Sequence, residues 1–323
     1  MQFNDIDKRL FGHIQTDFPL SRRPFSVLGR RLGISGDEVI DRIEHFKKEG
    51  VVRQIGPVLE ARRLGRRMTL VAMRVARDRL EKAAEAIRQH PGISHGYERE
   101  HDFNLWFTLS APSRAAIKAE LEKLGDIMEA EAVLELPVLK LFKIGFYLDM
   151  AGEEPQTSGS PGTTDGKARL SPADKAVINE LQQDLPLVAR PFDVMSTKLK
   201  MDVDQFLDRC RSLKERGIMR RFGAAVNHKR VGLKANAMTC WVVPARLVDM
   251  AGGKLAAHKE VSHCYERKTN ALWPYNLFAM IHGPTRQDCL KIADEVTQEC
   301  GLDRYIALFS TRELKKVRVK HLL

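Results

Sequence analysis

The chain of 323 residues has a net charge of +11, with 43% hydrophobic and 29% charged residues, a composition typical of soluble globular proteins. Its sequence has no apolar run near the roughly 20 residues that span a bilayer, which argues against an integral membrane protein. The length allows two or more hydrophobic cores, and the excess of Lys and Arg favours an anionic partner, either nucleic acid or a ligand with several carboxylates.

The amino terminus and the cysteines indicate the compartment. The first ten residues include Asp5 and Asp7 and lack the apolar segment of a signal peptide, so we expect a cytoplasmic protein. Five cysteines, an odd number without C-x-x-C spacing, predict free thiols rather than disulfides or structural zinc. The positive charge is concentrated late in the chain: residues 168–323 carry 27 Lys and Arg against 17 Asp and Glu, whereas residues 1–150 carry 25 against 22.

The chain contains a tandem repeat. A shift of 167 positions aligns residues 7–65 with residues 174–232 without a gap, and 20 of the 59 aligned positions are identical. Residues 151–168, rich in Gly, Ser, Thr and Pro, lie between the repeats and predict a flexible linker. A match of this length indicates the duplication of a two-part unit.

The first part of each repeat is predicted to be helical. Apolar residues recur at helical spacing until Pro19 in the first repeat and Pro186 in the second. After a shared Arg-Pro-Phe, the pattern predicts a short helix, a turn at Gly33, a second helix and an extended segment at 51–55. This order is typical of a winged helix-turn-helix.

The second part of each repeat alternates strands and helices. In the first repeat the expected elements lie at 70–75, 80–90, 94–100, 104–109, 113–124, near Val133 and at 142–147, and the second repeat has the same order between 237 and 319. A βαββαβ order predicts an α+β fold, with a ferredoxin-like antiparallel sheet, helices on one face, and two sheets packed as an internal pseudo-dimer. The expected domains are winged helix-turn-helix at 1–60 and 169–230, ferredoxin-like at 61–150 and 231–323, and a linker at 151–168.

This pair of domains resembles the Lrp/AsnC family of leucine-responsive regulators, in which helices bind DNA and the sheet domain binds effectors and dimerises. The helix that would read bases is acidic near its start in both repeats, although base and phosphate contacts need donors. The acidic residues are Asp37, Glu38, Asp41, Asp202, Asp204 and Asp208. The patterns Ser35-x-x-Glu38 and Asp202-x-x-Gln205 instead predict helix capping boxes, which argues against DNA reading by these helices.

A histidine, a tyrosine and an arginine recur at alternating positions in both repeats, in "SHGYERE" from Ser94 and "SHCYERK" from Ser262. Strand alternation places these side chains on one face. That face carries His95, Tyr97, Arg99 and His101 in the first repeat, and His263, Tyr265 and Arg267 in the second. Imidazole, phenol and guanidinium groups suit an acidic, planar ligand better than a hydrophobic core.

The repeats diverge after this motif. Asn104 aligns with Asn276 at a shift of 172, so the second repeat has gained about four residues, including Trp273 and Tyr275. It also has His282 where the first repeat has Ser110. The sequence shows no His and Cys cluster at metal-ligand spacing, no glycine-rich phosphate loop and no G-x-S-x-G elbow, so any chemistry must come from His, Tyr and Arg.

Longer strings carry a second resemblance, which covers nearly the whole chain apart from the linker. "SHGYEREHDFNLWFTL" with "ELPVLKLFKIGF" resembles the first subunit type of the siroheme decarboxylases, and "SHCYERKTNALWPYNLFAMIHG" with "LFSTRELKKVRVKHLL" resembles the second. The resemblance implies removal of two acetate carboxyl groups from siroheme as carbon dioxide. The implied product is didecarboxysiroheme, on the way to haem or haem d1. A haem- or effector-responsive regulator is the alternative.

This resemblance suggests roles for the recurring residues. Loss of carbon dioxide leaves a carbanion-like carbon that must be protonated, and we expect His101 as the general acid, with Tyr97 as the alternative donor. Arg99 is expected to orient the reacting acetate. The residues expected to bind substrate are His95, Trp106, Arg53, Arg220, His263, Tyr265, Arg267, Trp273, Tyr275, His282, Lys315 and Lys316.

His263 and His282 are also candidate axial ligands of the substrate iron. We expect no cofactor beyond the iron-containing siroheme, because the macrocycle is its own electron sink. The expected partners are siroheme and didecarboxysiroheme, and the two halves are expected to form an internal pseudo-heterodimer that could dimerise further. Neither specific DNA nor a membrane is an expected partner.

Overall fold

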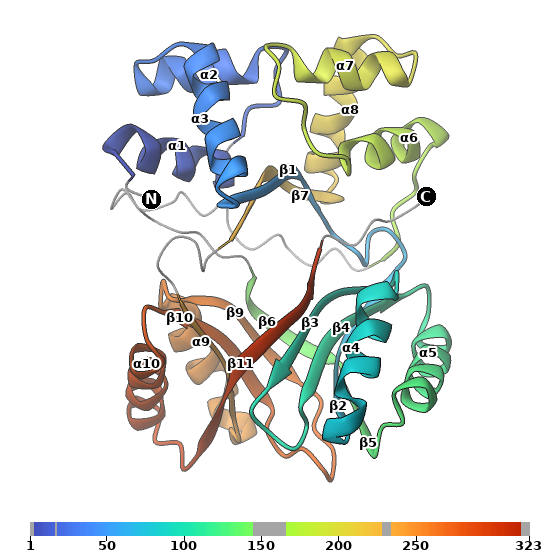
Figure 1. Ribbon diagram of the computed structural model, residues 1–323, viewed down its shortest axis with the longest axis vertical. Coiled ribbons are helices and arrows are strands. Elements are labelled where there is room, and N and C mark those ends of the chain that lie inside the picture. Colours follow the sequence, from blue (N-terminus) through green and yellow to red (C-terminus); the bar gives the residue numbers. More distant parts are fainter. Residues whose placement is uncertain (1–2, 17, 145–165, 228–233, 318–323) are drawn as a thin grey trace. The chain divides into compact units, whose positions relative to one another are not determined.

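The computed structural model describes residues 3–16, 18–144, 166–227 and 234–317 (Figure 1). The chain divides into two compact units that do not follow the two repeats. Among the described residues, the first unit contains those before residue 66 and those at 166–227, and the second contains the others. Each unit therefore combines the corresponding parts of both repeats.

The first unit contains the two predicted winged helix-turn-helix segments. Pro24 begins the second helix of the first repeat, and Gly33, with φ of 73°, forms the predicted turn after it. The elements of the first repeat are α1 (Asp5–Thr16), α2 (Pro24–Leu32), α3 (Gly36–Lys48) and β1 (Val52–Leu59). Those of the second are α6 (Pro172–Leu181), α7 (Pro191–Lys198), α8 (Val203–Glu215) and β7 (Met219–Val226).

The two segments share one hydrophobic core because their extended strands pair with each other. β1 and β7 form an antiparallel ribbon in which Gly56 lies opposite Gly223. A side chain at Gly223 would come within 2.6 Å of the Ile14 carbonyl oxygen, so glycine allows this close approach. Phe18 and Phe222, one from each repeat, pack with ring centroids 5.7 Å apart. The extended segment predicted at 51–55 thus joins the repeats.

The predicted helix caps are only partly formed as expected. The Ser35 side chain accepts a hydrogen bond from the Glu38 amide at 3.0 Å, and Asp202 caps α8 in the same way. The Glu38 carboxylate, however, pairs with Arg42 at 2.7 Å instead of returning to the cap. The N-caps are therefore confirmed, but the reciprocal bond of the first box was predicted wrongly because a basic residue one turn later competes for the carboxylate.

The second unit contains the two βαββαβ segments. The first consists of β2 (Arg67–Arg74), η1 (Arg77–Arg79), α4 (Leu80–Gln89), β3 (Ile93–Arg99), β4 (Leu105–Ala111), α5 (Arg114–Met128), β5 (Ala132–Leu136) and β6 (Val138–Ile144). The second consists of β8 (Ala235–Trp241), η3 (Ala245–Leu247), α9 (Val248–Ala257), β9 (Val261–Arg267), β10 (Leu277–Gly283), α10 (Arg286–Glu299) and β11 (Tyr305–Lys316).

Both segments have the predicted ferredoxin-like topology. The strands are ordered β5-β2-β4-β3 in the first and β11-β8-β10-β9 in the second, all antiparallel. In the first, α4 and α5 cover one face with apolar residues such as Ile87 and Leu121. In the second, α9 and α10 do the same with Leu255 and Val296. The fold class is confirmed.

The sheets are joined by exchanged strands, which the sequence did not reveal. β6 of the first repeat pairs with β9 of the second, and the end of β11 pairs with β3, so all nine strands form one sheet. The strand predicted at 142–147 begins earlier, at Val138, and residues 145–147 lie outside the described residues. β5 and β6 occupy opposite edges of the sheet yet are separated in sequence by Pro137 alone, so the sheet is rolled.

The side of the rolled sheet away from the helices encloses a separate core. Residues from both repeats meet there, among them Trp106, Leu308 and Phe278.

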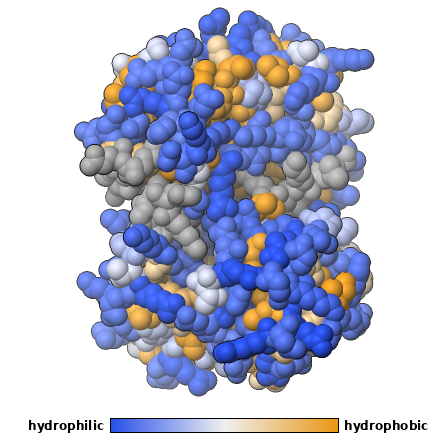
Figure 2. Space-filling model, in the orientation of Figure 1, coloured by the Kyte–Doolittle hydropathy of each residue, from blue (hydrophilic) through white to orange (hydrophobic). Residues whose placement is uncertain are grey.

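The face shown in Figure 2 is mostly hydrophilic, with apolar residues in small groups. None of the described helices is long and apolar enough to cross a membrane. The predicted linker falls largely outside the described residues, and the domain boundaries stay predictions.

Candidate active site

The first His-Tyr-Arg face forms on β3 as predicted, except at its end. Gly96 points toward α4, where an added side chain would meet Ile87 at 2.5 Å, so His95 and Tyr97 take the opposite face of the sheet. The strand ends at Arg99, and His101 lies in the loop that follows. The expectation that His101 continues the face is therefore wrong, because the chain turns before alternation reaches it.

The exchanged end of β11 completes this face with charged residues. Lys316 lies directly opposite His95, and Glu313 lies opposite Tyr97, so each pair shares a face. Lys315 points the other way and donates a hydrogen bond to the His90 carbonyl oxygen at 2.7 Å, at the end of α4. Of the two lysines predicted to bind substrate, only Lys316 lies on the His-Tyr-Arg side.

The second His-Tyr-Arg face has apolar residues at the matching positions. β6 places Ile144 opposite His263 and Leu141 opposite Tyr265. Lys143 corresponds to Lys315, since it donates to the His258 carbonyl oxygen at 2.7 Å. The duplicated backbone is thus retained while the chemistry of the exchanged strand differs between the two faces.

Arg99 and Arg267 are buried and bonded across the repeats. Arg99 is 3% exposed and donates to the Leu308 carbonyl oxygen at 2.6 Å, while Arg267 is 8% exposed and donates to the Leu136 carbonyl oxygen at 2.8 Å. Each guanidinium lies over the tyrosine of its own motif. Burial lowers the pKa of each arginine to about 10, which still leaves both charged at neutral pH. They hold strands and tyrosines in place.

His263 is linked to a second buried histidine. Ser262 Oγ lies 2.8 Å from Nδ1 of His263 and 2.8 Å from Nε2 of His282, which is 6% exposed. Burial, followed by the positive fields of His282, His95 and Lys316, lowers the pKa of His263 to about 3. His263 is therefore a neutral imidazole at physiological pH, and groups from both faces act on it electrostatically.

His101 lies beside the insertion of the second repeat. Its Nδ1 accepts a hydrogen bond from the Phe103 amide at 3.0 Å, and its ring meets the Trp273 ring edge-on at 5.5 Å between centroids. Partial burial lowers the pKa of His101, although Asp102 opposes this effect. A lowered pKa disfavours the imidazolium form at neutral pH.

The tryptophans expected to bind substrate belong to the inner core. Trp106 and Trp273 are each 1% exposed and pack together at 5.1 Å between ring centroids, and the Tyr275 ring is tilted against Trp273, also at 5.1 Å. Trp106 donates from its indole nitrogen to the Phe103 carbonyl oxygen at 2.7 Å. Both indoles are therefore buried in this structure, although Trp106 lies opposite Tyr97 on the neighbouring strand, and their contact with the ligand stays a prediction.

Two expected substrate-binding residues belong to the other compact unit. Arg53 lies on β1 and Arg220 on β7, where Arg220 forms an ion pair with Glu60. Both therefore belong to the compact unit that does not carry the His-Tyr-Arg faces, and their contact with substrate stays a prediction.

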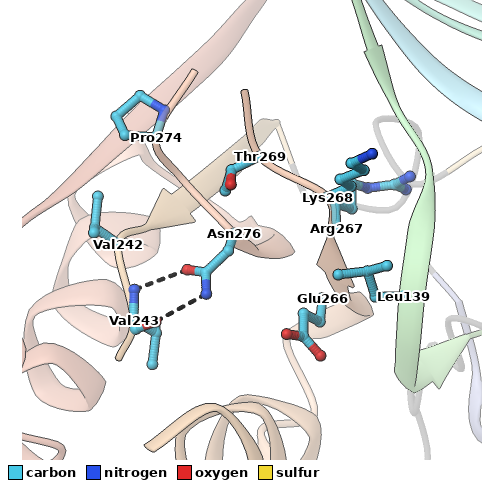
Figure 3. A pocket seen from close by; sticks show the side chains of 9 residues that line it. All are labelled: Leu139, Val242, Val243, Glu266, Arg267, Lys268, Thr269, Pro274 and Asn276. Atoms are coloured by element: carbon cyan, nitrogen blue, oxygen red, sulfur yellow. Dashed lines mark hydrogen bonds between the residues drawn. The ribbon is translucent and has the colours of Figure 1, made fainter. Parts of the chain in front are cut away.

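An open pocket of about 300 Å³ lies beside the second repeat's insertion (Figure 3). Asn276 stands in it and bonds to both the amide and the carbonyl oxygen of Val243, each at 2.8 Å. Asn104 makes the same pair of bonds to Val75 in the first repeat. The shared asparagine is therefore structural, and it holds the start of β4 and of β10 against the neighbouring loop.

Sequence reasoning missed the serines that precede the two histidines. Ser94 Oγ lies 2.8 Å from Nδ1 of His95, as Ser262 does from His263, and both serines are nearly fully buried. The repeated "SH" was the available signal. Glu313 was also missed because its position depends on strand exchange. Among the described residues, no group of three or more His, Cys, Asp or Glu side chains could hold a metal ion, and the five cysteines are free and buried.

Comparisons with known proteins agree with this architecture. Residues 63–143 and 230–315 match the model of the AsnC-like ligand binding domain, and residues 7–53 and 174–220 match the siroheme decarboxylase NirDL-like HTH domain. The fold is thus that of AsnC-like proteins, duplicated within one chain.

The full length of the chain identifies the family. A siroheme decarboxylase of Hydrogenobacter thermophilus is 41% identical over 98% of this chain and 95% of its own length. The crystal structure of the siroheme decarboxylase NirDL is 36% identical, with a TM-score of 0.74 over 99% of this chain and 95% of that one. It has also been solved in complex with an iron-uroporphyrin III analogue. The chain belongs to the siroheme decarboxylase family.

In other relatives the halves are separate proteins. A siroheme decarboxylase beta subunit of Methanosarcina barkeri is 36% identical over 47% of this chain and 99% of its own length. An alpha subunit from Desulfovibrio desulfuricans is 41% identical over 44% of this chain and 81% of its own length. The two halves of this chain form an internal pseudo-heterodimer, joined by the exchanged strands β6 and β11.

Proposed function

We propose that this chain is a siroheme decarboxylase, a carboxy-lyase that removes two acetate carboxyl groups from siroheme as carbon dioxide to give didecarboxysiroheme. The observation that carries the proposal is the match of both halves, in order and nearly end to end, to a protein of that activity. The product would serve haem d1 or haem synthesis. The five buried free thiols support a cytoplasmic setting.

Each round of the reaction breaks the bond between the methylene and carboxylate carbons of one acetate group. The electron pair of that bond is delocalised into the conjugated macrocycle, carbon dioxide leaves, and a proton adds to the methylene carbon to make a methyl group. The macrocycle accepts the electron pair, so no cofactor beyond the iron-containing siroheme is required. The protein must bind carboxylates, supply the proton and limit access of water.

One siroheme is proposed to contact both His-Tyr-Arg faces. On the first face, Lys316 and His95 can bind carboxylates at the edge of the macrocycle. On the second face, Leu141 and Ile144 provide an apolar wall suited to the flat macrocycle. The field of Lys316 at His263 supports this arrangement, because it means that groups of the two faces lie within electrostatic range.

Tyr97 is proposed as the proton donor, in place of His101. It lies on the same face as His95, opposite Glu313 on the neighbouring strand. His101 is the second candidate, because its lowered pKa disfavours a protonated imidazole at neutral pH. Arg99 is proposed as a positioning residue, because its guanidinium lies 5.4 Å from the centre of the Tyr97 ring and is itself fixed by Leu308.

The test is anaerobic incubation of the purified chain with siroheme, followed by mass analysis of the product. We expect the loss of two molecules of carbon dioxide per siroheme. Tyr97→Phe should lower kcat by about 100-fold or more, which is the usual contribution of a general acid, while the matched variant Tyr265→Phe should retain most activity. A fully active Tyr97→Phe would remove Tyr97 as donor and leave His101→Ala as the deciding variant.

A transcriptional regulator is the second candidate function, favoured by the helix-turn-helix segments alone. The acidic start of α8 argues against it, because contacts to bases and phosphates need hydrogen-bond donors at this position. Asp204 is an acceptor, and it is already paired with Arg22. Specific DNA binding is therefore not proposed, and further homodimerisation stays a prediction. Tight, salt-dependent binding to promoter DNA without turnover of siroheme would reverse this preference.

A further inference from the structure

Glu313 lies on the exchanged end of β11, and its side chain faces the same side of the sheet as the first His-Tyr-Arg face. Its neighbours in the chain point the other way: Arg312 pairs with Glu81 of α4 at 2.8 Å, and Leu314 packs in the core beneath α4 and α5. Alternation therefore turns Glu313, which is partly buried, away from the helices. There it lies directly opposite Tyr97, a pairing that brings Cβ atoms within about 4.5–5.5 Å of each other.

The strand exchange does not require this carboxylate. In the second half, Lys140 of β6 forms the matching ion pair on the helix side, with Asp249 of α9 at 2.5 Å. The helix-side ion pair is thus kept in both halves, but Leu141 occupies the position of Glu313. Because the same strand pairing forms with an apolar residue there, the stability of the fold does not explain the charge of Glu313.

A carboxylate is also unexpected beside a site for a polyanion. Lys316, the next residue of β11 on this side, lies opposite His95 and suits the carboxylates of the substrate. Glu313 opposes their binding, because like charges a few Å apart repel each other, more strongly where water is scarce. Decarboxylation removes this repulsion, since the reacting carboxylate leaves as neutral carbon dioxide. A charge that disfavours the bound substrate more than the transition state lowers the barrier.

We infer that Glu313 is a catalytic residue that contacts the reacting acetate and repels it, while Lys316 binds the propionate beside it. This inference rests on the proposed function. Uroporphyrin-type macrocycles carry an acetate and a propionate at adjacent positions of each ring, which matches two successive residues on one side of β11. Glu313 gains and loses no proton. The bond between the methylene and carboxylate carbons breaks, the proton of Tyr97 adds to the methylene carbon, and the phenolate regains a proton from water.

The experiment uses the full chain and two probes, with binding measured by optical titration. Iron-uroporphyrin III carries the acetates, whereas iron-coproporphyrin III has methyl groups in their place and keeps the propionates. Glu313→Gln removes the charge and keeps the shape, so it should tighten iron-uroporphyrin III binding by about tenfold and leave iron-coproporphyrin III binding unchanged. The matched control is Glu98→Gln, which removes a carboxylate on the helix side of the same strand pair, 3.8 Å from Nε of Arg312, and should change neither.

Turnover of siroheme distinguishes a catalytic role from a structural one. Glu313→Gln should lower kcat by about tenfold and lower KM as well, because it removes repulsion from the bound substrate. Glu313→Asp keeps the charge and should retain more activity than Glu313→Gln. If Glu313→Gln folds poorly, Glu313→Leu provides the residue that the second half accommodates at this position, and it should show the same gain for iron-uroporphyrin III relative to iron-coproporphyrin III.

The inference is overturned if Glu313→Gln binds iron-uroporphyrin III no tighter than wild type, if both probes gain equally, or if kcat is unchanged. These outcomes are separate from the proposed function. A gain for iron-uroporphyrin III alone, in a chain that releases no carbon dioxide from siroheme, would contradict the proposed function and retain the contact between Glu313 and an acetate. Decarboxylation of siroheme by the wild type, with probe affinities that Glu313→Gln does not change, would contradict the inference alone.

Discussion

The two His-Tyr-Arg faces have the same backbone and different neighbours. Each motif strand pairs with a strand exchanged from the other half, and the two pairings have corresponding register. The first face receives Glu313 and Lys316, whereas the second receives Leu141 and Ile144 at the matching positions. The comparison shows how the two copies of a duplicated unit can diverge, since residues outside the repeated motif make one face charged and the other apolar.

The largest expected effect concerns the inner core that joins the halves. Trp106→Ala and Trp273→Ala should each lower the free energy of unfolding by about 3–5 kcal/mol, because both rings are 1% exposed. The corresponding Phe variants sharpen the comparison. Trp273→Phe should cost less than Trp106→Phe, because Nε1 of Trp273 has no hydrogen-bond partner and Nε1 of Trp106 donates to Phe103.

Urea denaturation of the four Trp variants measures these differences. Variants of Trp273 that are as stable as wild type would show that the inserted segment containing Trp273 does not contribute to the stability of the core. That result would restore Trp273 as a residue able to move and contact the ligand.

The second prediction tests whether His263 is the neutral histidine. Its folded pKa of about 3 lies below the unfolded value of 6.5, so unfolding takes up a proton in that range. Stability is therefore retained above pH 6.5 and lost as the pH falls toward 3. This residue should account for about 2 kcal/mol of destabilisation between pH 7 and pH 5. His263→Gln should flatten the pH dependence measured by thermal unfolding, and an unchanged slope would contradict the burial of His263.

The smallest expected effect concerns the exchanged strands. Lys316→Ile gives the first face the residue of the second, and it should weaken iron-uroporphyrin III binding by about tenfold through loss of a charged contact. The reciprocal Ile144→Lys should also weaken binding, because it adds a charge where the macrocycle face is proposed to lie. Its effect should be smaller, because it removes no charged contact. Isothermal titration at low and high salt measures both. Equal effects of the two variants would show that the faces are equivalent.

Much of the fold could be predicted from the sequence, because it depends on local periodicity and on the repeat itself. The turn at Gly33, the βαββαβ order and the shared face of His95 and Tyr97 all follow from spacing along one segment. The end of that face at Arg99 did not follow, since alternation continues in sequence after the strand has ended.

Only the tertiary structure decided which of the predicted residues meet. The sequence by itself determined the duplication, the fold class and the family motifs. Strand exchange then put Lys316 and Lys315 on opposite sides of the sheet, the inner core buried Trp106 and Trp273, and Ser262 joined His263 to His282. The physical reason is that strand pairing and hydrogen bonds between distant residues depend on register across the sheet, which no local pattern records.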